Sequence, residues 1–361
     1  MHLCSSTSAS TYVFIGTYTG DGPSDSKGIY ALELDETKST LTPLGLSVAT
    51  VNASYILVHP SHKYLYGVNE NDEGTVTAFQ IDPAQPSRLH YINHQSSRGS
   101  GPCYISTNRA GDHLFVANYN NGTVAVLPID VNNGSLRSFS SFDQQNGSSV
   151  DPVRQASAHA HCILLDRKEE YALSADLGSD QIYHYKFSVN DGTITRTAIT
   201  KAFRAGDGPR HIIFNSDERF MYLMNELKSE ITVFRYSPIM EPIQVISSIP
   251  SNFTSLNTGA EIVLHPMNGR FLYASNRGHD SIAVFTVDLE LGILALIQHI
   301  SVQGQTPRNF NISPDGKYLI VANQNSHNVV LFTIDEQTGK LSATGSSVQI
   351  SVPTCVKFLV Q

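Results

Sequence analysis

The sequence lacks any run of 18 consecutive apolar residues, the length that a membrane-spanning helix needs, so we expect no contact with a membrane. Its first residues, MHLCSSTSAS, have neither the basic region nor the apolar core of a secretory signal. We therefore expect a cytoplasmic protein, with residues 1–10 as a flexible tail. Charge is scarce as well: 16% of the residues are charged, against roughly 25% in an average globular protein. The net charge of −8 argues against a nucleic-acid partner, because nucleic-acid binders are basic.

Cysteine is also rare, and none of the four stands in a CxxC pair or at zinc-ligand spacing. We predict four free thiols, as is usual in a reducing compartment, at Cys4, Cys103, Cys162 and Cys355. The sequence contains no P-loop, no GxGxxG fingerprint and no GxSxG nucleophile elbow. The sequence therefore gives no indication of a nucleotide-binding site or of a serine nucleophile.

What the sequence does contain is one phrase repeated along its whole length: a turn, an aromatic-rich strand, a small residue and then an anchor residue, usually Asn. The anchors follow one another at intervals of 47 to 58 residues and are Thr17, Asn69, Asn118, Asp176, Asn225, Asn276 and Asn323. Each unit holds four short strand signals, such as 55–60, 64–70, 75–82 and 89–95, joined by Asn-Gly, Asp-Gly or Pro-Asp-Gly turns. Four antiparallel strands in about 50 residues describe a propeller blade. We therefore predict an all-β, seven-bladed β-propeller that forms one domain over residues 1–361.

The two ends of the sequence predict how the ring closes. The chain begins with a second-strand signal, TYVFIGTYT, and the first-strand signal is missing. It finishes with PTCVKFLV (353–360), which resembles a first strand that no second strand follows. We expect the C-terminal strand to join the N-terminal blade, which hides edges that would otherwise pair with other chains.

The repeat also predicts where chemistry is concentrated. The innermost strand and the next one form a hairpin, so the start of the first and the end of the second meet at one mouth of the channel. The positions 15 residues before the anchors, completed by alignment of the C-terminal strand, are Ser54, Cys103, His161, Arg210, Glu261, Arg308 and Thr354. The positions directly after the anchors are Tyr18, Glu70, Tyr119, Leu177, Glu226, Arg277 and Gln324. Three arginines, three glutamates and a histidine thus converge on one mouth.

Structural roles compete with functional ones at these positions. The anchor residues recur in every unit, so we expect them to satisfy backbone groups of turns. The charged residues differ between units, as a single site requires, although an ion-pair network lining a water channel is an alternative. His159 and His161 stand two apart and could chelate a metal, a weak signal. Cys103 and Cys162 are expected to be small buried strand residues, and the histidines expected at the surface are His59, His62, His265, His279 and His327.

A resemblance joins these observations. The phrases that carry it fall at matching places in successive units: AHAHCILL (158–165), GPRHIIF (208–214), FMYLMNE (220–226), AEIVLHP (260–266), GRFLYASNRGHDSIAVF (269–285) and TPRNFNISPDGKYLIVAN (306–323). With them the chain resembles the propeller-type lactonase family, which includes bacterial 6-phosphogluconolactonase and fungal carboxy-cis,cis-muconate cyclase. The resemblance implies a catalytic set of His161, Arg210, Glu226 and Arg277. We assign substrate contacts to His159, His211, Glu261, Arg308, Asn309, Tyr18 and Glu70. Tyr104 stands where histidine is expected in many relatives, which bears on substrate shape.

The leading hypothesis is hydrolysis of a sugar lactone, 6-phosphogluconolactone, without cofactor or metal. Glu226 would activate water, His161 would act as acid or base, and Arg210 and Arg277 would stabilise the oxyanion. The alternatives are a muconate cyclase that uses the same groups and a non-enzymatic scaffold, which would need no charged mouth. We expect a small anionic lactone as the partner and a monomer or weak homodimer.

Overall fold

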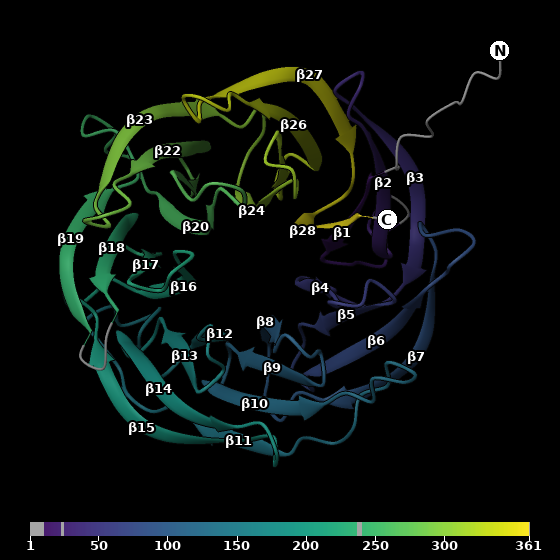
Figure 1. The fold of residues 1–361 in the computed structure, drawn as a ribbon, viewed down its shortest axis with the longest axis horizontal. Helices are drawn as coiled ribbons and strands as arrows, with labels where there is room; N and C mark the ends of the chain where they lie inside the picture. Colours follow the sequence, from purple (N-terminus) through teal and green to yellow (C-terminus); the bar gives the residue numbers. More distant parts are fainter. Residues whose placement is uncertain (1–10, 23–24, 237–239, 361) are drawn as a thin grey trace.

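The computed structural model describes residues 11–22, 25–236 and 240–360, and these contain 28 strands and no helix. The strands form seven four-stranded sheets, which Figure 1 shows arranged as blades around a central axis. The prediction of an all-β, seven-bladed propeller is therefore confirmed. Within the described ranges no helix is long and apolar enough to cross a membrane. The predicted tail at residues 1–10, with Cys4, lies outside them.

Every blade runs from the axis outward through four antiparallel strands. The innermost strands are β4 (Ile56–Val58), β8 (Pro102–Thr107), β12 (Ala160–Leu165), β16 (Pro209–Phe214), β20 (Thr258–Leu264), β24 (Pro307–Ile312) and β28 (Pro353–Val360). The second strands, which end at the predicted anchors or one residue beyond, are β1 (Thr11–Thr17), β5 (Tyr64–Asn69), β9 (His113–Asn118), β13 (Tyr171–Asp176), β17 (Phe220–Asn225), β21 (Phe271–Arg277) and β25 (Tyr318–Asn323).

The two outer strands of each blade complete the repeat. The third strands are β2 (Gly28–Asp35), β6 (Thr75–Ile81), β10 (Thr123–Pro128), β14 (Gln181–Ser188), β18 (Glu230–Arg235), β22 (Ser281–Val287) and β26 (Asn328–Ile334). The outermost are β3 (Thr40–Ala49), β7 (Leu89–Ser96), β11 (Ser141–Gln144), β15 (Thr193–Lys201), β19 (Glu241–Ser247), β23 (Leu294–Ser301) and β27 (Leu341–Gln349).

The ring closes as the sequence predicts. β28 is the innermost strand of the blade whose other three strands are β1, β2 and β3. Its antiparallel register with β1 runs from Thr11 opposite Val360 to Thr17 opposite Pro353. This pairing satisfies the edge of β1 that would otherwise be open.

Four of the anchor side chains, Asn69, Asn118, Asn276 and Asn323, join a blade to the connection that enters it. Asn69 Nδ2 donates to the Val51 carbonyl at 2.6 Å, and Asn276 Nδ2 donates to the Ser248 carbonyl at 2.8 Å. Both carbonyls lie between the outermost strand of the preceding blade and the innermost strand of the next. The prediction that the anchors satisfy turn backbone groups is confirmed for these four.

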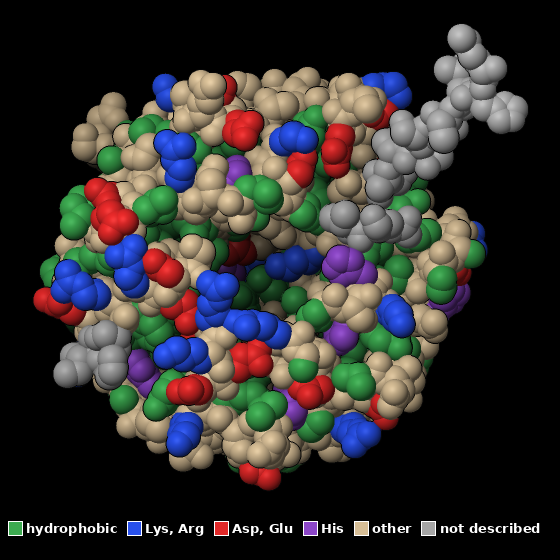
Figure 2. Space-filling view, viewed as in Figure 1, with side chains coloured by type: hydrophobic (Ala, Val, Ile, Leu, Met, Phe, Trp, Pro, Cys, Tyr) green, Lys and Arg blue, Asp and Glu red, His purple; other side chains and the backbone are tan. Residues whose placement is uncertain are grey.

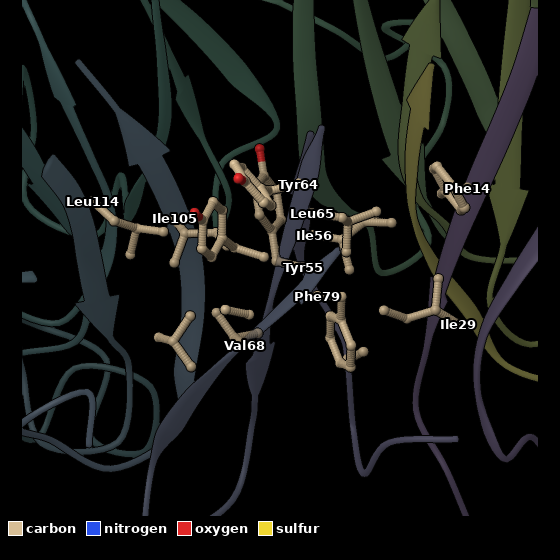
Figure 3. Packing of buried hydrophobic residues seen from close by; sticks show 14 of the residues in the cluster. Phe14, Ile29, Tyr55, Ile56, Tyr64, Leu65, Val68, Phe79, Ile105 and Leu114 are labelled. Carbon is tan, nitrogen blue, oxygen red and sulfur yellow. The ribbon is translucent and has the colours of Figure 1, made fainter. Parts of the chain in front are cut away.

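Apolar side chains fill the space between neighbouring blades. Figure 3 shows one such cluster, in which Phe14 of the first blade, Ile56 and Phe79 of the second and Ile105 of the third are buried together. Burying a side chain of this size stabilises a fold by about 1.5–3 kcal/mol. The blades are therefore held together by apolar contacts as well as by the closing strand.

Two histidines expected at the surface are instead buried, and the expectation for them was wrong. His59 and His265 are 3% and 4% exposed, and their Nε2 atoms donate to the carbonyls of Gly111 and Gly316 in the next blade, at 2.8 and 3.0 Å. Gly111 has a φ of 71°, and a Cβ there would lie 2.1 Å from His59 Nε2. Each imidazole thus fits under a turn that only glycine can form, and links two blades.

Candidate active site

Bulges in the innermost strands bring the predicted site residues together. The register with the second strand slips beside His161 in β12, Arg210 in β16 and Arg308 in β24. A bulge leaves one residue without a partner and turns its side chain. Consecutive residues, such as Arg210 with His211, then face the same channel instead of opposite sides of the sheet.

Glu226 is the centre of the mouth and is only 2% exposed. Its Oε2 lies 2.9 Å from Arg210 Nε and 3.0 Å from Arg277 Nη2, while its Oε1 lies 2.5 Å from Arg154 Nη2. His161 Nε2 is 3.9 Å from Oε2. Burial by itself raises the pKa of Glu226, but the surrounding guanidinium charges hold it well below the usual range. A carboxylate so fully engaged is suited to fixing arginines and is a weak base.

The arginines keep donors that no protein group satisfies. Arg210 Nη1 donates to the Ala260 carbonyl at 2.7 Å, and Arg277 Nη2 donates to the Gly259 carbonyl at 3.0 Å. The buried Nε of Arg277 has no partner among the described residues. Burial lowers the pKa of Arg277 to about 10, against the opposing effect of Glu226, so it remains charged at neutral pH. A buried cationic donor without a partner is matched to an anionic ligand.

A second cluster, beside the one around Glu226, pairs a histidine with a carboxylate. His211 Nδ1 lies 2.7 Å from Glu261 Oε1, and Asn309 Nδ2 donates to Glu261 Oε2. Burial, with the positive charge of Arg210, lowers the pKa of His211, although Glu261 opposes the shift. His211 is therefore neutral near pH 7, and Nδ1–H donation to Glu261 leaves the lone pair on Nε2, which lies 3.4 Å from Arg210 Nη1. This pairing is the arrangement in which an imidazole accepts a proton.

Glu70 forms a third group on the far side of the mouth. Tyr18 Oη donates to Glu70 Oε1 at 2.8 Å, and Ser54 Oγ donates to Oε2. Arg308 Nη2 is 3.9 Å from Glu70, and the guanidinium lies 5.2 Å from the centre of the Tyr18 ring. Burial raises the pKa of Tyr18, so the phenol stays protonated. Arg308 thus has a counter-charge but no side-chain hydrogen bond to another described residue.

A cavity of about 10 Å³, room for one water molecule, lies between the second and third groups. It is lined by Ser54, Tyr55, Cys103, Arg210, His211, Arg308, Asn309 and Thr354. Cys103 Sγ is 3.9 Å from His161 Nδ1, and burial raises the pKa of this thiol well above its usual value. The prediction that Cys103 and Cys162 are buried strand residues is confirmed, and both are free thiols, as is Cys355.

The two histidines of the HAH sequence have different surroundings. Burial first, and then the charge of Arg210, lower the pKa of His161 well below its usual value, so its ring is neutral. His159 stacks on Tyr119 with ring centres 4.5 Å apart, and its Nδ1 donates to the Tyr119 carbonyl at 2.7 Å. In residues 11–22, 25–236 and 240–360 no group of three or more His, Cys, Asp or Glu side chains is placed to hold a metal ion.

One mouth residue was missed by the sequence reasoning. Arg154 lies between β11 and β12 and contacts both Glu226 and, through Nη2 at 3.1 Å, the Tyr119 hydroxyl. The count along the repeat cannot find it, because this connection is longer than the equivalent connections between the other blades. Of the counted positions, Leu177 is fully buried and makes no charged contact. Tyr104 packs its ring against His211, with centres 5.1 Å apart.

Comparisons with known proteins agree with this geometry. A family model described as "Lactonase, 7-bladed beta-propeller" matches residues 12–358. The chain is 37% identical to the 6-phosphogluconolactonase of Bacillus subtilis over 96% of its length and 98% of the relative's, and 32% identical to that of Formosa agariphila over 91% and 94%. Among solved structures, a putative 6-phosphogluconolactonase from Bacteroides fragilis has a TM-score of 0.89 at 35% identity, covering 98% and 99% of the two chains. A periplasmic gluconolactonase from Pseudomonas aeruginosa has a TM-score of 0.90 at 32% identity, covering 97% and 99%.

Proposed function

Because the chain belongs to the seven-bladed β-propeller lactonase family, we propose that it hydrolyses a sugar lactone, 6-phosphogluconolactone, at the mouth centred on Glu226. The names of the relatives from Bacillus subtilis and Formosa agariphila support this substrate. The observation that carries the proposal is that Arg210, Arg308 and the pair of His211 with Glu261 meet at one water-sized cavity. Arg277, whose Nε has no partner among the described residues, shares Glu226 with Arg210 beside it. Lactone opening needs a base for water, donors for the oxyanion and a proton for the leaving oxygen.

The base in this proposal is His211. The attacking water occupies the cavity, and as its oxygen bonds to the carbonyl carbon its proton passes to His211 Nε2. Glu261, 2.7 Å from Nδ1, stabilises the imidazolium that forms. When the ring C–O bond breaks, the same proton passes to the ring oxygen, which becomes a hydroxyl group. Glu226, the base preferred from sequence, is reassigned, because its lowered pKa and three guanidinium partners leave it little basicity.

The oxyanion in this proposal is bound by arginine. Arg210 and Arg277 are fixed through Glu226, so their donors are oriented before substrate arrives. Donors that need no reorientation during reaction stabilise developing charge more than water does. His161 is neutral and lies beside them, where it donates a hydrogen bond to the substrate.

The test is a substrate panel with one purified sample. We expect hydrolysis of 6-phosphogluconolactone well above its spontaneous rate, with glucono-δ-lactone, carboxymuconate and an unrelated ester measured in parallel. Activity should persist in excess chelator, because the arginines of the mouth repel a hard cation. Hydrolysis of glucono-δ-lactone alone would instead support the activity named for the Pseudomonas aeruginosa neighbour. Loss of muconate absorbance without lactone hydrolysis would support a cyclase, and no turnover at all would support a scaffold.

A further inference from the structure

Positive charge exceeds negative charge in the mouth. The four arginines Arg154, Arg210, Arg277 and Arg308 face the three glutamates Glu70, Glu226 and Glu261, and the imidazoles His161 and His211 are neutral. Lys357, whose Nζ lies 3.3 Å from the Tyr55 hydroxyl at the cavity, adds one more positive charge, so the group carries a formal charge of about +2 in a chain of net charge −8. Arg154 supplies half of this excess, and with it part of the attraction of the mouth for an anion.

Arg154 is also the arginine that reaches solvent. Its side chain is 38% exposed, whereas those of Arg210, Arg277 and Arg308 are 3%, 14% and 18% exposed. The other three lie below it, around the cavity and Glu226. The guanidinium of Arg154 therefore forms part of the rim through which a substrate enters.

The loop that carries Arg154 is fixed. Asp151 Oδ1 accepts the backbone N–H groups of Val153 and Arg154, each at 2.9 Å. The next residue, Gln155, is fully buried, and its Nε2 donates to the Leu177 carbonyl at 2.9 Å. An anchored loop loses little conformational entropy when a ligand binds, so its donors are ready before the ligand arrives.

Only one of the three guanidinium nitrogens of Arg154 contacts another described residue. Nη2 contacts the Tyr119 hydroxyl at 3.1 Å and Glu226 Oε1 at 2.5 Å, which fixes the orientation of the plane. Nε and Nη1 have no partner among the described residues. A planar guanidinium with free donors is suited to a phosphate group.

We propose that Arg154 binds the phosphate group of the substrate and makes the site selective for phosphorylated over neutral sugar lactones. The inference rests on the proposed function. In 6-phosphogluconolactone the carbonyl carbon C1 and the carbon C5, which carries the phosphorylated C6, flank the ring oxygen, and their bonds out of the ring diverge. When the carbonyl group points down to Arg210 and Arg277, the phosphate points outward to the rim, where Arg154 has its free donors.

The experiment compares two substrates that differ only in the phosphate, 6-phosphogluconolactone and glucono-δ-lactone. For Arg154→Ala we expect KM for the phosphorylated lactone to rise about 10- to 100-fold, the usual effect of losing a charged hydrogen bond. The kinetic constants for glucono-δ-lactone should change much less, and Arg154→Lys should restore part of the loss. Lys228→Ala is the matched control, because Lys228 is an exposed cation on the same face and pairs with none of the three glutamates.

Equal losses on the two lactones would overturn the proposal, since they would show that Arg154 acts only by holding Glu226. An equal rise in KM for the phosphorylated lactone in Lys228→Ala would also overturn the proposal. It would show that any positive charge on this face attracts the substrate, without a specific contact by Arg154. Calorimetry with 6-phosphogluconate and gluconate separates this inference from the proposed function. Suppose that wild type hydrolyses neither lactone. The phosphate site is still supported if wild type binds 6-phosphogluconate more tightly than gluconate and Arg154→Ala loses this difference. It is refuted if wild type binds the two acids equally.

Discussion

Both ends of the central channel carry arginine and acidic side chains, but they use them differently. The end opposite the candidate site opens on the face in Figure 2 as a hollow of about 580 Å³, lined in part by Arg109, Arg167, Glu169 and Glu218. There Arg109 Nη2 donates to the Arg167 carbonyl, and Arg167 Nη1 donates to that of Ser216. The backbone N–H groups of Arg109 and Arg167 donate to Glu169 and Glu218. Each contact joins the turn of one blade to the turn of the next.

At the candidate site the hollow is far smaller, yet the charges are buried and meet one another side chain to side chain. The size of a hollow is therefore a poor guide to the active site of this propeller. Buried charges with unsatisfied donors are a better guide, because their desolvation is offset fully only when a ligand binds. The opposite mouth has the larger space, but its charged groups serve the joints between blades.

The largest effect is expected at the centre of the candidate mouth. Arg277→Ala removes a guanidinium whose Nε has no protein partner, and we expect kcat to fall on the order of 10²- to 10³-fold. Steady-state kinetics on 6-phosphogluconolactone, with melting temperatures in parallel, measure this change. A variant that melts like wild type and keeps its full rate would remove Arg277 from the site and weaken the contrast between the mouths.

The histidine–carboxylate pair should give the next effect, together with a change in pH dependence. His211→Gln is expected to lower kcat about 10²-fold. Since the pKa of His211 is lowered and the base must be unprotonated, the wild-type rate should rise with pH through a value below the usual 6.5 of histidine. Glu261→Gln removes the charge that opposes this shift, so the acid limb should move to still lower pH while kcat falls.

His161→Gln is the comparison for the base assignment. If the acid limb disappears in His161→Gln and persists in His211→Gln, then His161 is the base and our assignment of His211 is wrong. The reverse result would support the pair of His211 with Glu261. Rates for both variants are measured between pH 4 and 8 on one lactone.

The smallest effect is expected at the opposite mouth. Arg167→Ala should leave kcat and KM within about twofold of wild type, and lower the unfolding free energy by no more than about 1 kcal/mol, as for an exposed polar contact. Kinetics and urea unfolding test this expectation. A large loss of activity in Arg167→Ala, at unchanged stability, would mean that the two mouths are coupled.

The repeat explains why the fold and most of the mouth could be predicted from sequence. Every blade uses the same hairpin, so a fixed distance from an anchor leads to the same place, and Arg210, Glu226 and Arg277 were found although they come from different strands and connections. Arg154 could not be found in this way, because it belongs to the connection between β11 and β12, which is longer than its equivalents between the other blades. Counting residues from the anchors also shows which charged residues share the mouth, but not which of them form ion pairs. Glu226 is a poor base because of its ion pairs with arginine, which lower its pKa.

Contacts between residues far apart in the sequence are the second feature that could not be predicted from it. Glu230 starts β18 and pairs with Arg204, which precedes the innermost strand of the same blade. His59 and His265 sit in turn-like sequence and are buried by the turn of the neighbouring blade. These contacts join residues about 26 to 52 positions apart, and no local pattern predicts them.

The closing strand completes the ring and the pocket late in synthesis. β28 follows β1 by more than 300 residues, so at about 5–20 residues per second the edge of β1 waits roughly 20 to 70 s for its partner. Thr354, which borders the water-sized cavity, arrives with that strand and donates to the Gly16 carbonyl at 3.1 Å. A nascent chain that has already built the other six blades therefore has an incomplete pocket and an open edge. The pocket and the open edge of β1 are therefore completed together, when residues 353–360 pair with β1.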